Sequence, residues 1–320
     1  MQRIGVMTSG GYAPGMNAAI RAVVRKAVFH GIEVMGIRRG FNGFIEGDMV
    51  LLHSGSVGGI IQRGGTVLFS ARSPEFTTAT GRKKAWESVL RFGLQGLVAI
   101  GGDGTFHGVR AFHREYGLPV VCIPATIDND IAGTDYAIGF DTAVNNVVEA
   151  IDKIKDTATS HERTFVIEVM GRSTGHIALA AGLAGGAESI LIPERPVNID
   201  EVCARLIRGQ RRGKEHSIII VAEGVASALE MGLAIKERTG FDTKVTILGH
   251  LQRGGTPSAF DRNLASILGY RAVEMLMNGA GLEMVGWLRG ETVSHELENV
   301  LAQPRPADSG MYQMADILSM

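Results

Sequence analysis

Cysteine, aromatic residues and an excess of charge of either sign are all scarce in this sequence of 320 residues. The two cysteines, Cys122 and Cys203, stand in apolar stretches, which favours buried reduced thiols over a disulfide or a metal site. Reduced thiols, and no charged leader followed by an apolar run, predict a cytoplasmic protein. The formal net charge of −1 argues against nucleic acid and anionic membranes as partners, because both attract a basic face.

Long hydrophobic runs and proline-rich linkers are also missing. The most apolar long stretch, Ile177–Ile192, is interrupted by glycines and by Glu188, so it does not predict a membrane-spanning helix. Glycine, by contrast, is abundant at 43 residues, which suits an α/β protein with many tight turns between strands and helices. The length predicts two domains of roughly 100–200 residues each, although no shift in composition marks their boundary.

Short apolar runs of strand length recur along the chain, and most of them are continuous rather than alternating. They are Ile4–Met7, Val34–Ile37, Leu97–Ile100, Val120–Ile123, Phe165–Val169, Ser189–Ile192, Ile218–Val221 and Val245–Leu248. Continuous apolar strands indicate burial on both faces. Apolar residues at helical spacing lie between them, in Asn17–Phe29, Ala143–Lys155, Glu201–Arg211 and Asn263–Met277. The alternation predicts two doubly wound α/β domains with mainly parallel sheets.

Two glycine-rich segments follow predicted strands and precede predicted helices. The first is Thr8-Ser9-Gly10-Gly11 with Pro14–Asn17, whose glycines and helix N-terminus suit a phosphate or a plain tight turn equally well. The second is Gly101-Gly102-Asp103-Gly104-Thr105, in which Asp103 could hold a magnesium ion. The second segment resembles the nucleotide loop shared by phosphofructokinases, NAD kinases and diacylglycerol kinases, and a glycine turn without a ligand is the weaker alternative.

A pair of carboxylates follows another buried strand, in Pro124–Asp130. Asp128 and Asp130 stand two residues apart beside Thr126, and such a pair is costly unless a cation or a proton separates the charges. A kinase needs one carboxylate to deprotonate the acceptor hydroxyl and another near the metal. An Asx-rich turn is the alternative, but it does not explain why the pair stands at a strand end.

Four arginines lie beside glycine, serine or strand-end residues, where they could bind phosphate in a bidentate manner: Arg72, Arg163, Arg172 and Arg253. Glu223 and His250 end predicted strands and could bind sugar hydroxyls. Any one of these residues alone would more often be structural.

Together these motifs resemble the bacterial type of ATP-dependent 6-phosphofructokinase, from Arg3 to about Gly286. The resemblance rests on the segments 101–104 (GGDG), 126–130 (TIDND), 160–163 (SHER), 168–172 (EVMGR) and 249–255 (GHLQRGG). It implies two doubly wound domains, an ATP-binding one of residues 1–139 and 253–303 and a fructose-6-phosphate-binding one of residues 140–252 and 304–320. It further implies Mg²⁺ as cofactor and a homotetramer with active sites at one interface and effector sites at another.

The resemblance also implies roles for single residues. Catalysis is assigned to Asp128, as base for the sugar 1-hydroxyl, and to Arg172, Thr126 and Gly11. The residues implied to hold ATP are Gly11, Arg72, Arg82, Asp103, Gly104, Thr105 and Gly108, with Asp103 on the magnesium. Those implied to surround the sugar are Thr126, Asp128, Asp130, Arg163, Met170, Gly171, Arg172, Glu223, Lys244, His250 and Arg253. Arg163 and Lys244 are expected to reach the sugar phosphate across a subunit interface.

The chain departs from the family pattern at several positions. Tyr12 replaces an aspartate beside the first glycine pair, and Lys244 replaces an arginine, which predicts weaker capture of the sugar phosphate. An effector such as ADP or phosphoenolpyruvate is expected at Arg21, Arg25, Lys155, Gly186, Glu188, Arg212, Lys214 and His216. Because Lys155, Gly59 and Glu215 replace an arginine, an aspartate and a lysine, we expect weak allosteric control.

Three other functions compete with this interpretation. A pyrophosphate-dependent phosphofructokinase is disfavoured because such relatives carry aspartate at the position of Gly104 and lysine at that of Ala125. A non-catalytic sensor of phosphosugars or nucleotides is suggested by Tyr12 and Lys244, yet it would not need the costly carboxylates Asp128 and Asp130. An NAD kinase matches only residues 101–105.

Overall fold

The computed structural model describes residues 1–161 and 163–319, and the chain folds into two compact units. Unit 1 consists of Met1–Ile127, Ile131–Thr142 and Arg253–Arg305, and unit 2 consists of Asp128–Asp130, Ala143–Gln252 and Pro306–Met320. Which ligand each unit binds stays a prediction. None of the helices in the described part of the chain is both long enough and apolar enough to cross a bilayer.

The strands are β1 (Arg3–Thr8), β2 (Glu33–Ile37), β3 (Met49–Leu52), β4 (Leu97–Gly101), β5 (Val120–Pro124), β6 (Thr164–Val169), β7 (Ser189–Leu191), β8 (Ser217–Ala222), β9 (Thr243–Ile247), β10 (Leu282–Leu288) and β11 (Glu291–Glu296). The α-helices are α1 (Met16–Phe29), α2 (Phe41–Glu46), α3 (Ala79–Phe92), α4 (Asp103–Tyr116), α5 (Phe140–His161), α6 (His176–Ala184), α7 (Ile199–Arg211), α8 (Ala228–Thr239), α9 (Ala259–Met277), α10 (Leu297–Leu301) and α11 (Ser309–Leu318). The chain also forms the 3₁₀ turns η1 (Glu75–Thr77) and η2 (Gly249–Arg253).

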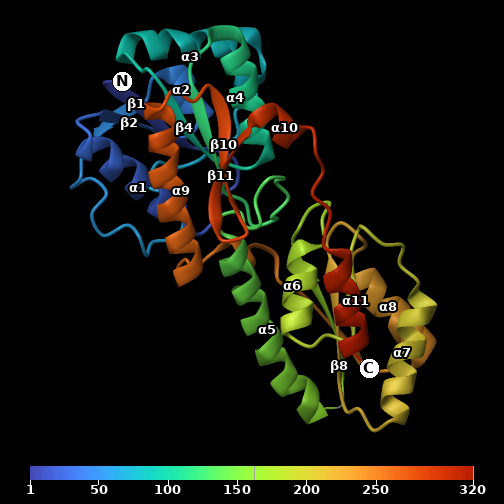
Figure 1. Cartoon of the computed structure of the whole chain (residues 1–320). Coiled ribbons are helices and arrows are strands. Elements are labelled where there is room, and N and C mark those ends of the chain that lie inside the picture. The colour runs from blue at the N-terminus through green and yellow to red at the C-terminus, as the bar shows by residue number, and fades with distance from the viewer. Residues whose placement is uncertain (162, 320) are drawn as a thin grey trace. The chain divides into compact units, whose positions relative to one another are not determined.

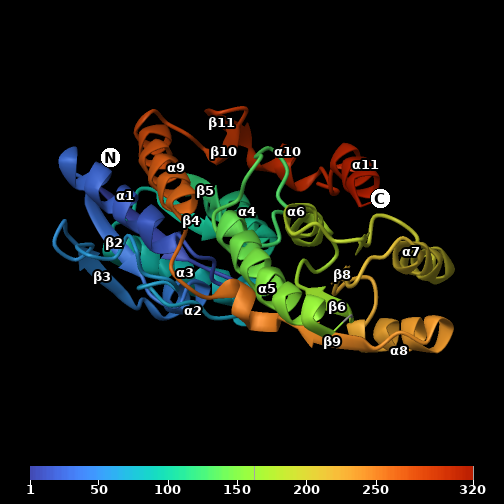
Figure 2. The ribbon, with the colours of Figure 1, turned by 90° about the horizontal axis from the view of Figure 1, so that it is seen from below.

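Unit 1 contains a seven-stranded sheet with the order β11-β10-β5-β4-β1-β2-β3. Neighbouring strands from β10 to β2 are parallel, and the edge strands β3 and β11 are antiparallel to their partners. Helices α1 and α9 pack together on one face, while α2, α3 and α4 cover the other (Figure 1, Figure 2). The central strands are therefore buried on both faces, as their continuous apolar sequences predict.

The core under α2, α3 and α4 contains a group of phenylalanines among aliphatic side chains. Phe44, Phe106 and Phe112 are fully buried, and Phe41 stacks on Phe76 with 3.9 Å between the ring centroids. Such aromatic contacts add stability beyond the apolar area that they bury. Phe106, near the start of α4, is buried in the same core, and the glycine-rich segment after β4 leads into this helix.

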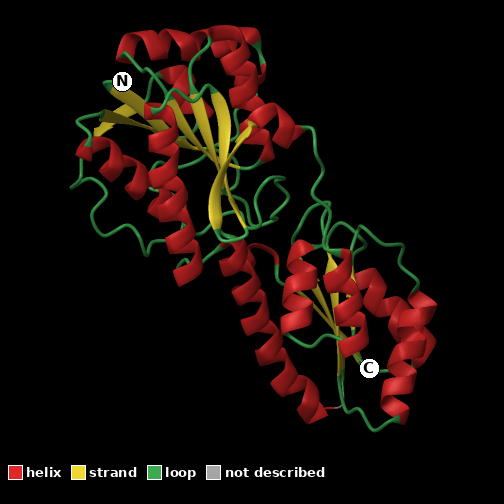
Figure 3. Ribbon diagram, viewed as in Figure 1, coloured by secondary structure: helices red, strands yellow, loops and turns green. Residues whose placement is uncertain are grey.

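Unit 2 contains a four-stranded, fully parallel sheet with the order β7-β8-β6-β9. Helices α7 and α8 pack on one face, and α6, backed by α11, packs on the other (Figure 3). Both units are thus α/β layers with parallel central strands, which confirms the predicted fold class. Cys122 in β5 and Cys203 in α7 are buried and free, and burial raises the pKa of both thiols.

Strand β9 corrects one expectation from the sequence. The apolar run Val245–Leu248 predicted a strand buried on both faces, but the strand spans Thr243–Ile247 and is only half-buried, with Ile247 exposed. The reason is topological, because β9 is an edge strand of its sheet. Apolar composition alone does not separate an edge strand from a central one.

Candidate functional site

Three strand ends of unit 1 meet at one edge of its sheet. Strands β1, β4 and β5 are parallel neighbours, so their carboxyl ends lie together. The backbone closes this edge, because the amide of Ser9 donates to the carbonyl of Ile100 (3.1 Å) and the amide of Ala125 donates to that of Gly101 (2.9 Å). Ligands of open α/β sheets bind outside such carboxyl ends. The segments that begin at residues 8, 101 and 124 are therefore brought to one place.

Gly101 is required by the close approach of these segments. A Cβ atom at this position would lie 2.4 Å from Thr105 Oγ1 and 2.7 Å from the carbonyl oxygen of Ser9. Thr126 is buried in the same region, and its Cβ is 3.5 Å from where a Cβ of Gly102 would be. The two glycine-rich segments and Thr126 thus pack directly against one another.

The first turn of α4 carries Asp103 and Gly104, and both are exposed. Gly102 precedes the helix without a side-chain cap, and its carbonyl accepts from the amides of Thr105 (2.9 Å) and Phe106 (3.1 Å). The start of the helix therefore has no side-chain cap from the residue before it. A Cβ at Gly104 would meet nothing within 4 Å, and Gly104 does not have a positive φ. No contact within the described residues therefore demands glycine at this position. His107, one turn later, approaches Asp103 with 3.4 Å between Nε2 and Oδ1.

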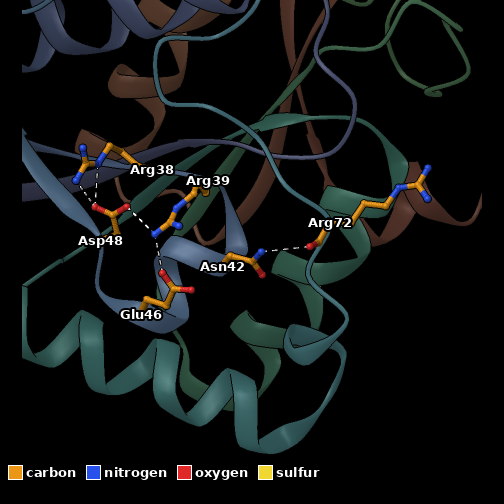
Figure 4. Close-up of polar contacts among 6 residues, drawn as sticks. All are labelled: Arg38, Arg39, Asn42, Glu46, Asp48 and Arg72. Atoms are coloured by element: carbon orange, nitrogen blue, oxygen red, sulfur yellow. Dashed lines mark hydrogen bonds and ion pairs between the residues drawn. The ribbon is translucent and has the colours of Figure 1, made fainter.

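The two arginines expected at the nucleotide differ in their surroundings. Figure 4 shows that the guanidinium of Arg72 points away from the neighbouring ion pairs, while the backbone carbonyl of Arg72 accepts a hydrogen bond from Asn42 Nδ2 (3.3 Å). In those ion pairs Arg38 binds Asp48, and Arg39 binds both Glu46 and Asp48. Arg82, in contrast, is bidentate on Glu115 and also donates to the carbonyl of Thr77 (2.8 Å). The structure gives Arg82 a structural role, and a role at the nucleotide stays untested.

The other expected nucleotide glycines also have neighbours that explain them. A Cβ at Gly108 would lie 2.7 Å from the ring of Phe41, so packing of α4 on α2 requires glycine there. A Cβ at Gly11 would lie 3.0 Å from Nη1 of Arg253, which donates to the carbonyl oxygen of Tyr12 at 3.4 Å. The guanidinium of Arg253 thus lies over the first glycine-rich segment within unit 1. Tyr12 is half-buried and does not displace this arginine.

In unit 2, the segment after β6 forms a tight loop held by Glu223. The carboxylate of Glu223 accepts hydrogen bonds from the amides of Gly171 (3.3 Å) and Arg172 (2.9 Å). Arg172 has a φ of +53°, a left-handed conformation that costs energy for a residue with a side chain. The anchored loop therefore holds Arg172 in a strained backbone conformation, with 63% of its side chain exposed.

Asp128 lies beneath this loop and is almost completely buried, with 2% of its side chain exposed. Arg172 Nε approaches Asp128 Oδ2 at 3.4 Å, and the hydroxyl of Thr174 donates to the carbonyl oxygen of Asp128 (3.3 Å). The next residue, Asn129, has a φ of +52°, and Asp130 is half-buried. Two segments that are far apart in sequence thus place one buried carboxylate beside one exposed cation.

Gln252 contacts the candidate site and was not among the residues expected from the sequence. It is 1% exposed; its Oε1 accepts from the amide of Met170 (3.1 Å), and its Nε2 donates to the carbonyl of Gly249 (3.0 Å). Gln252 therefore ties the loop of Met170–Arg172 to the turn that carries His250, whose side chain is exposed. The only signal in the sequence was its place within the 249–255 motif.

A model of the phosphofructokinase family matches residues 3–276. An ATP-dependent 6-phosphofructokinase of Bacillus pumilus is 58% identical over 320 residues, which is 100% of both chains, and that of Bacillus cytotoxicus is 59% identical over the same span. This chain belongs to the phosphofructokinase family. The solved phosphofructokinase of Saccharomyces cerevisiae superimposes with a TM-score of 0.91 at 37% identity, covering 94% of this chain and 45% of the yeast chain.

Two residues that the family pattern assigns to the sugar lie at the opposite end of the sheet in unit 2. Arg163 precedes β6 and Lys244 is the second residue of β9, whereas Arg172 and Glu223 follow the carboxyl ends of β6 and β8. Arg163 and Lys244 both bind Asp242, at 2.7 and 2.9 Å, and these bonds lower the pKa of Asp242. In the same 160–163 motif, Glu162 lies outside the described residues.

The expected effector residues fall into several groups. Arg21 and Arg25 lie one turn apart on α1, and burial together with Arg25 lowers the pKa of Arg21. In unit 2, a cavity of 340 Å³ is lined by Glu188, Arg212 and Lys214, with Lys214 Nζ 2.5 Å from Glu188 Oε1. A Cβ at Gly186 would lie 3.5 Å from Lys155 Nζ.

His216 and Glu215 line a different cavity of 230 Å³, together with Arg163 and Asp242, and Lys214 borders both cavities. Glu215 thus lines a different cavity from Glu188 and Arg212. Effector binding at either cavity, and its weakening by Lys155, Gly59 and Glu215, stay predictions.

Proposed function

We propose that this chain transfers the γ-phosphoryl group of ATP to the 1-hydroxyl of fructose 6-phosphate, giving fructose 1,6-bisphosphate and ADP. Relatives that are 57–59% identical over the whole chain are ATP-dependent 6-phosphofructokinases, which supports this function. The observation that carries the proposal is the buried carboxylate of Asp128 beside the exposed guanidinium of Arg172. A structural ion pair would need neither the strained backbone of Arg172 nor a loop anchored by Glu223.

The two side chains suit the two halves of a phosphoryl transfer. Asp128 accepts the proton of the sugar 1-hydroxyl as the oxygen attacks the γ-phosphorus, and the bond from that phosphorus to the leaving ADP oxygen breaks. Arg172 moves from the carboxylate towards the transferred group and neutralises charge on its equatorial oxygens. Its exposure allows that movement, while the burial of Asp128 excludes water as a competing proton donor.

The open space at Gly104 favours ATP over pyrophosphate as the donor. A glycine costs about 1 kcal/mol relative to alanine within a helix, and the protein's own packing does not require one here. A phosphate of a nucleotide lying against the first turn of α4 would explain why glycine stands at position 104, since the amides and the dipole of that turn attract anions. An aspartate at position 104 would repel that phosphate and leave room only for a shorter donor.

Mg²⁺ fits the same turn. Its preferred ligands are oxygens, and kinases usually hold it with one or two carboxylates plus the substrate's phosphates. Asp103 presents an exposed carboxylate in this turn, and no cluster of three or more ligating side chains occurs in the described part of the chain. Asp103 would therefore hold the ion together with the nucleotide, where the ion would neutralise phosphate charge.

The positions of Arg163 and Lys244 support an assembly of several copies. Arg163 precedes β6 and Arg172 lies beyond its carboxyl end, so six strand residues separate the two arginines, roughly 20 Å at 3.3 Å per residue. Lys244 pairs with Phe165, near the same amino end of β6. One sugar phosphate cannot contact both groups within a single chain. The proposal therefore assigns Arg163 and Lys244 to the sugar bound by a neighbouring copy, as the expected homotetramer requires.

Product formation from fructose 6-phosphate, ATP and Mg²⁺ tests the proposal. We expect turnover by the unchanged protein and a loss of at least about 10²-fold in kcat for Asp128→Asn, the ordinary contribution of a general base. Glu230→Gln, which neutralises an exposed carboxylate on α8, serves as the matched control and should retain full activity. Folded protein without turnover would favour the sensor function, and full activity of Asp128→Asn would remove Asp128 as the base.

A further inference from the structure

Asp261 is a buried carboxylate to which the proposed mechanism gives no role. It lies in the first turn of α9 with 0% of the residue exposed. Its Oδ1 accepts from the amide of Gly139 (2.8 Å), and its Oδ2 accepts from the amide (2.8 Å) and the hydroxyl (2.5 Å) of Thr142. All three donors are neutral. A buried charge held by neutral donors is costly, so its presence calls for an explanation.

The donors belong to the beginning of α5. This helix starts at Phe140, so Gly139 occupies the capping position, where a glycine has no side chain to accept from the first amides. Asp261 supplies that acceptor from another helix, and its negative charge also complements the positive end of the α5 dipole. The capping interaction is therefore tertiary, and it fixes the first turn of α5 against α9.

The capped turn supports the first glycine-rich segment. Gly139 has a φ of +99°, and a Cβ there would lie 2.6 Å from Ala13 Cβ and 3.1 Å from Pro14 Cδ. A Cβ at Gly15 would lie 2.6 Å from Ile138 Cγ2 and 3.4 Å from the carbonyl oxygen of Asp261. The segment between Gly11 and α1 therefore rests on residues 138–139, and any shift of Gly139 displaces it.

The same turn supports the end of β5. The amide of Ile138 donates to the carbonyl of Pro124 (2.9 Å), and Ile138 forms an isolated bridge with Ala125. Pro124 and Ala125 immediately precede Thr126, which packs beside Gly102. Asp261 thus fixes the position of Ile138 and Gly139. Both the first glycine-rich segment and the end of β5 pack against these two residues.

We propose that Asp261 is a positioning residue for phosphoryl transfer, which sets the first glycine-rich segment and the strand end before Thr126 through Gly139 and Thr142. The role rests on the proposed function. A carboxylate is needed because both of its oxygens accept; an amide would turn an N–H group towards an N–H donor. Burial, and to a lesser extent Asp141, raises the pKa of Asp261 to about 6, so that it remains ionised at neutral pH.

Steady-state kinetics of Asp261→Asn is the first test. Because a misplacement of about 1 Å can cost about 10²-fold in rate, we expect kcat to fall at least about tenfold while KM for ATP changes less than about threefold. Asp308→Asn is the matched control, since Asp308 caps α11 in unit 2 through the amides of Gly310 and Met311. A kcat within twofold of the unchanged protein would overturn the proposal.

Hydrogen exchange separates this claim from the proposed function, because it does not need turnover. We expect at least about tenfold faster amide exchange in Asp261→Asn for peptides covering both 9–17 and 137–142. Faster exchange in 137–142 alone, or in neither, would overturn the positioning role. If Asp261→Asn does not fold, Thr142→Val keeps the carboxylate and removes the hydroxyl that donates to it and accepts from the amide of Ser258 (3.0 Å). This variant should lower kcat about threefold or more, and an unchanged kcat would count against the proposal.

Discussion

The same buried carboxylate gives a pH-dependent contribution to stability that can be worked out from its surroundings. Burial raises the pKa of Asp261 from 3.8 to about 6 in the folded protein, and Asp141 adds to the increase. Because one pKa unit corresponds to about 1.4 kcal/mol, the shift of about two units is equivalent to about 3 kcal/mol. The folded state binds this proton more tightly than the unfolded state. The stabilisation is therefore fully present below pH 3.8 and is lost as the pH rises through about 6.

Replacement by asparagine removes this titration and leaves a side chain of the same shape. We expect the free energy of unfolding of the unchanged protein, minus that of Asp261→Asn, to fall by about 3 kcal/mol between pH 4 and pH 7.5. Urea denaturation followed by tryptophan fluorescence is suitable, since both tryptophans, Trp86 and Trp287, lie in unit 1 with Asp261. A difference that is flat, or that rises with pH, would refute the reasoning, because it would mean that the hydrogen bonds outweigh desolvation.

Ionisation of Asp261 should therefore lower the stability of the protein and support its activity. Ionisation weakens the folded state, yet the ionised form is the one that accepts all three hydrogen bonds at the start of α5. A carboxylate retained at such a cost is typical of functional sites.

Three further predictions concern the ligands. Gly104→Asp should lower kcat/KM for ATP at least about 10²-fold in initial-rate assays, because a carboxylate would repel the nucleotide in the open first turn of α4; an unchanged value would contradict that reasoning. Lys244→Arg should lower KM for fructose 6-phosphate severalfold, since a planar fork binds phosphate better than an ammonium group, and an unaltered KM would count against this role. Millimolar phosphoenolpyruvate should leave the sugar saturation curve nearly unchanged because Lys155, Gly59 and Glu215 depart from the expected effector residues, whereas a strong shift would show that the site is intact.

Much of the fold could be predicted from the sequence because the central strands have a distinctive composition. Runs such as Leu97–Ile100 and Val120–Ile123 are apolar throughout, which is typical of strands covered on both faces. Strands β3, β10 and β11, towards the two margins of the sheet, were not predicted. Strand β3 is as short and as apolar as the predicted runs, and nothing in its composition explains why it was missed; β10 is interrupted by Glu283 and Gly286, and β11 is largely polar.

Some residues of the candidate site could likewise be predicted from the sequence, and others could not. Residues in local motifs, such as Asp103, Asp128 and Arg172, could be proposed because each stands at the end of a predicted strand. Asp261 could not, since its partners Gly139 and Thr142 lie 122 and 119 residues away and no local pattern links them. The sequence also could not predict which side chains pack against one another.

The decisive measurement is the rate of fructose 1,6-bisphosphate formation from fructose 6-phosphate and Mg²⁺, with ATP and with pyrophosphate as alternative donors. We expect turnover with ATP and none with pyrophosphate, because the open first turn of α4 at Gly104 is expected to accommodate a nucleotide. Turnover with pyrophosphate alone, or with neither donor in a folded protein, would contradict it.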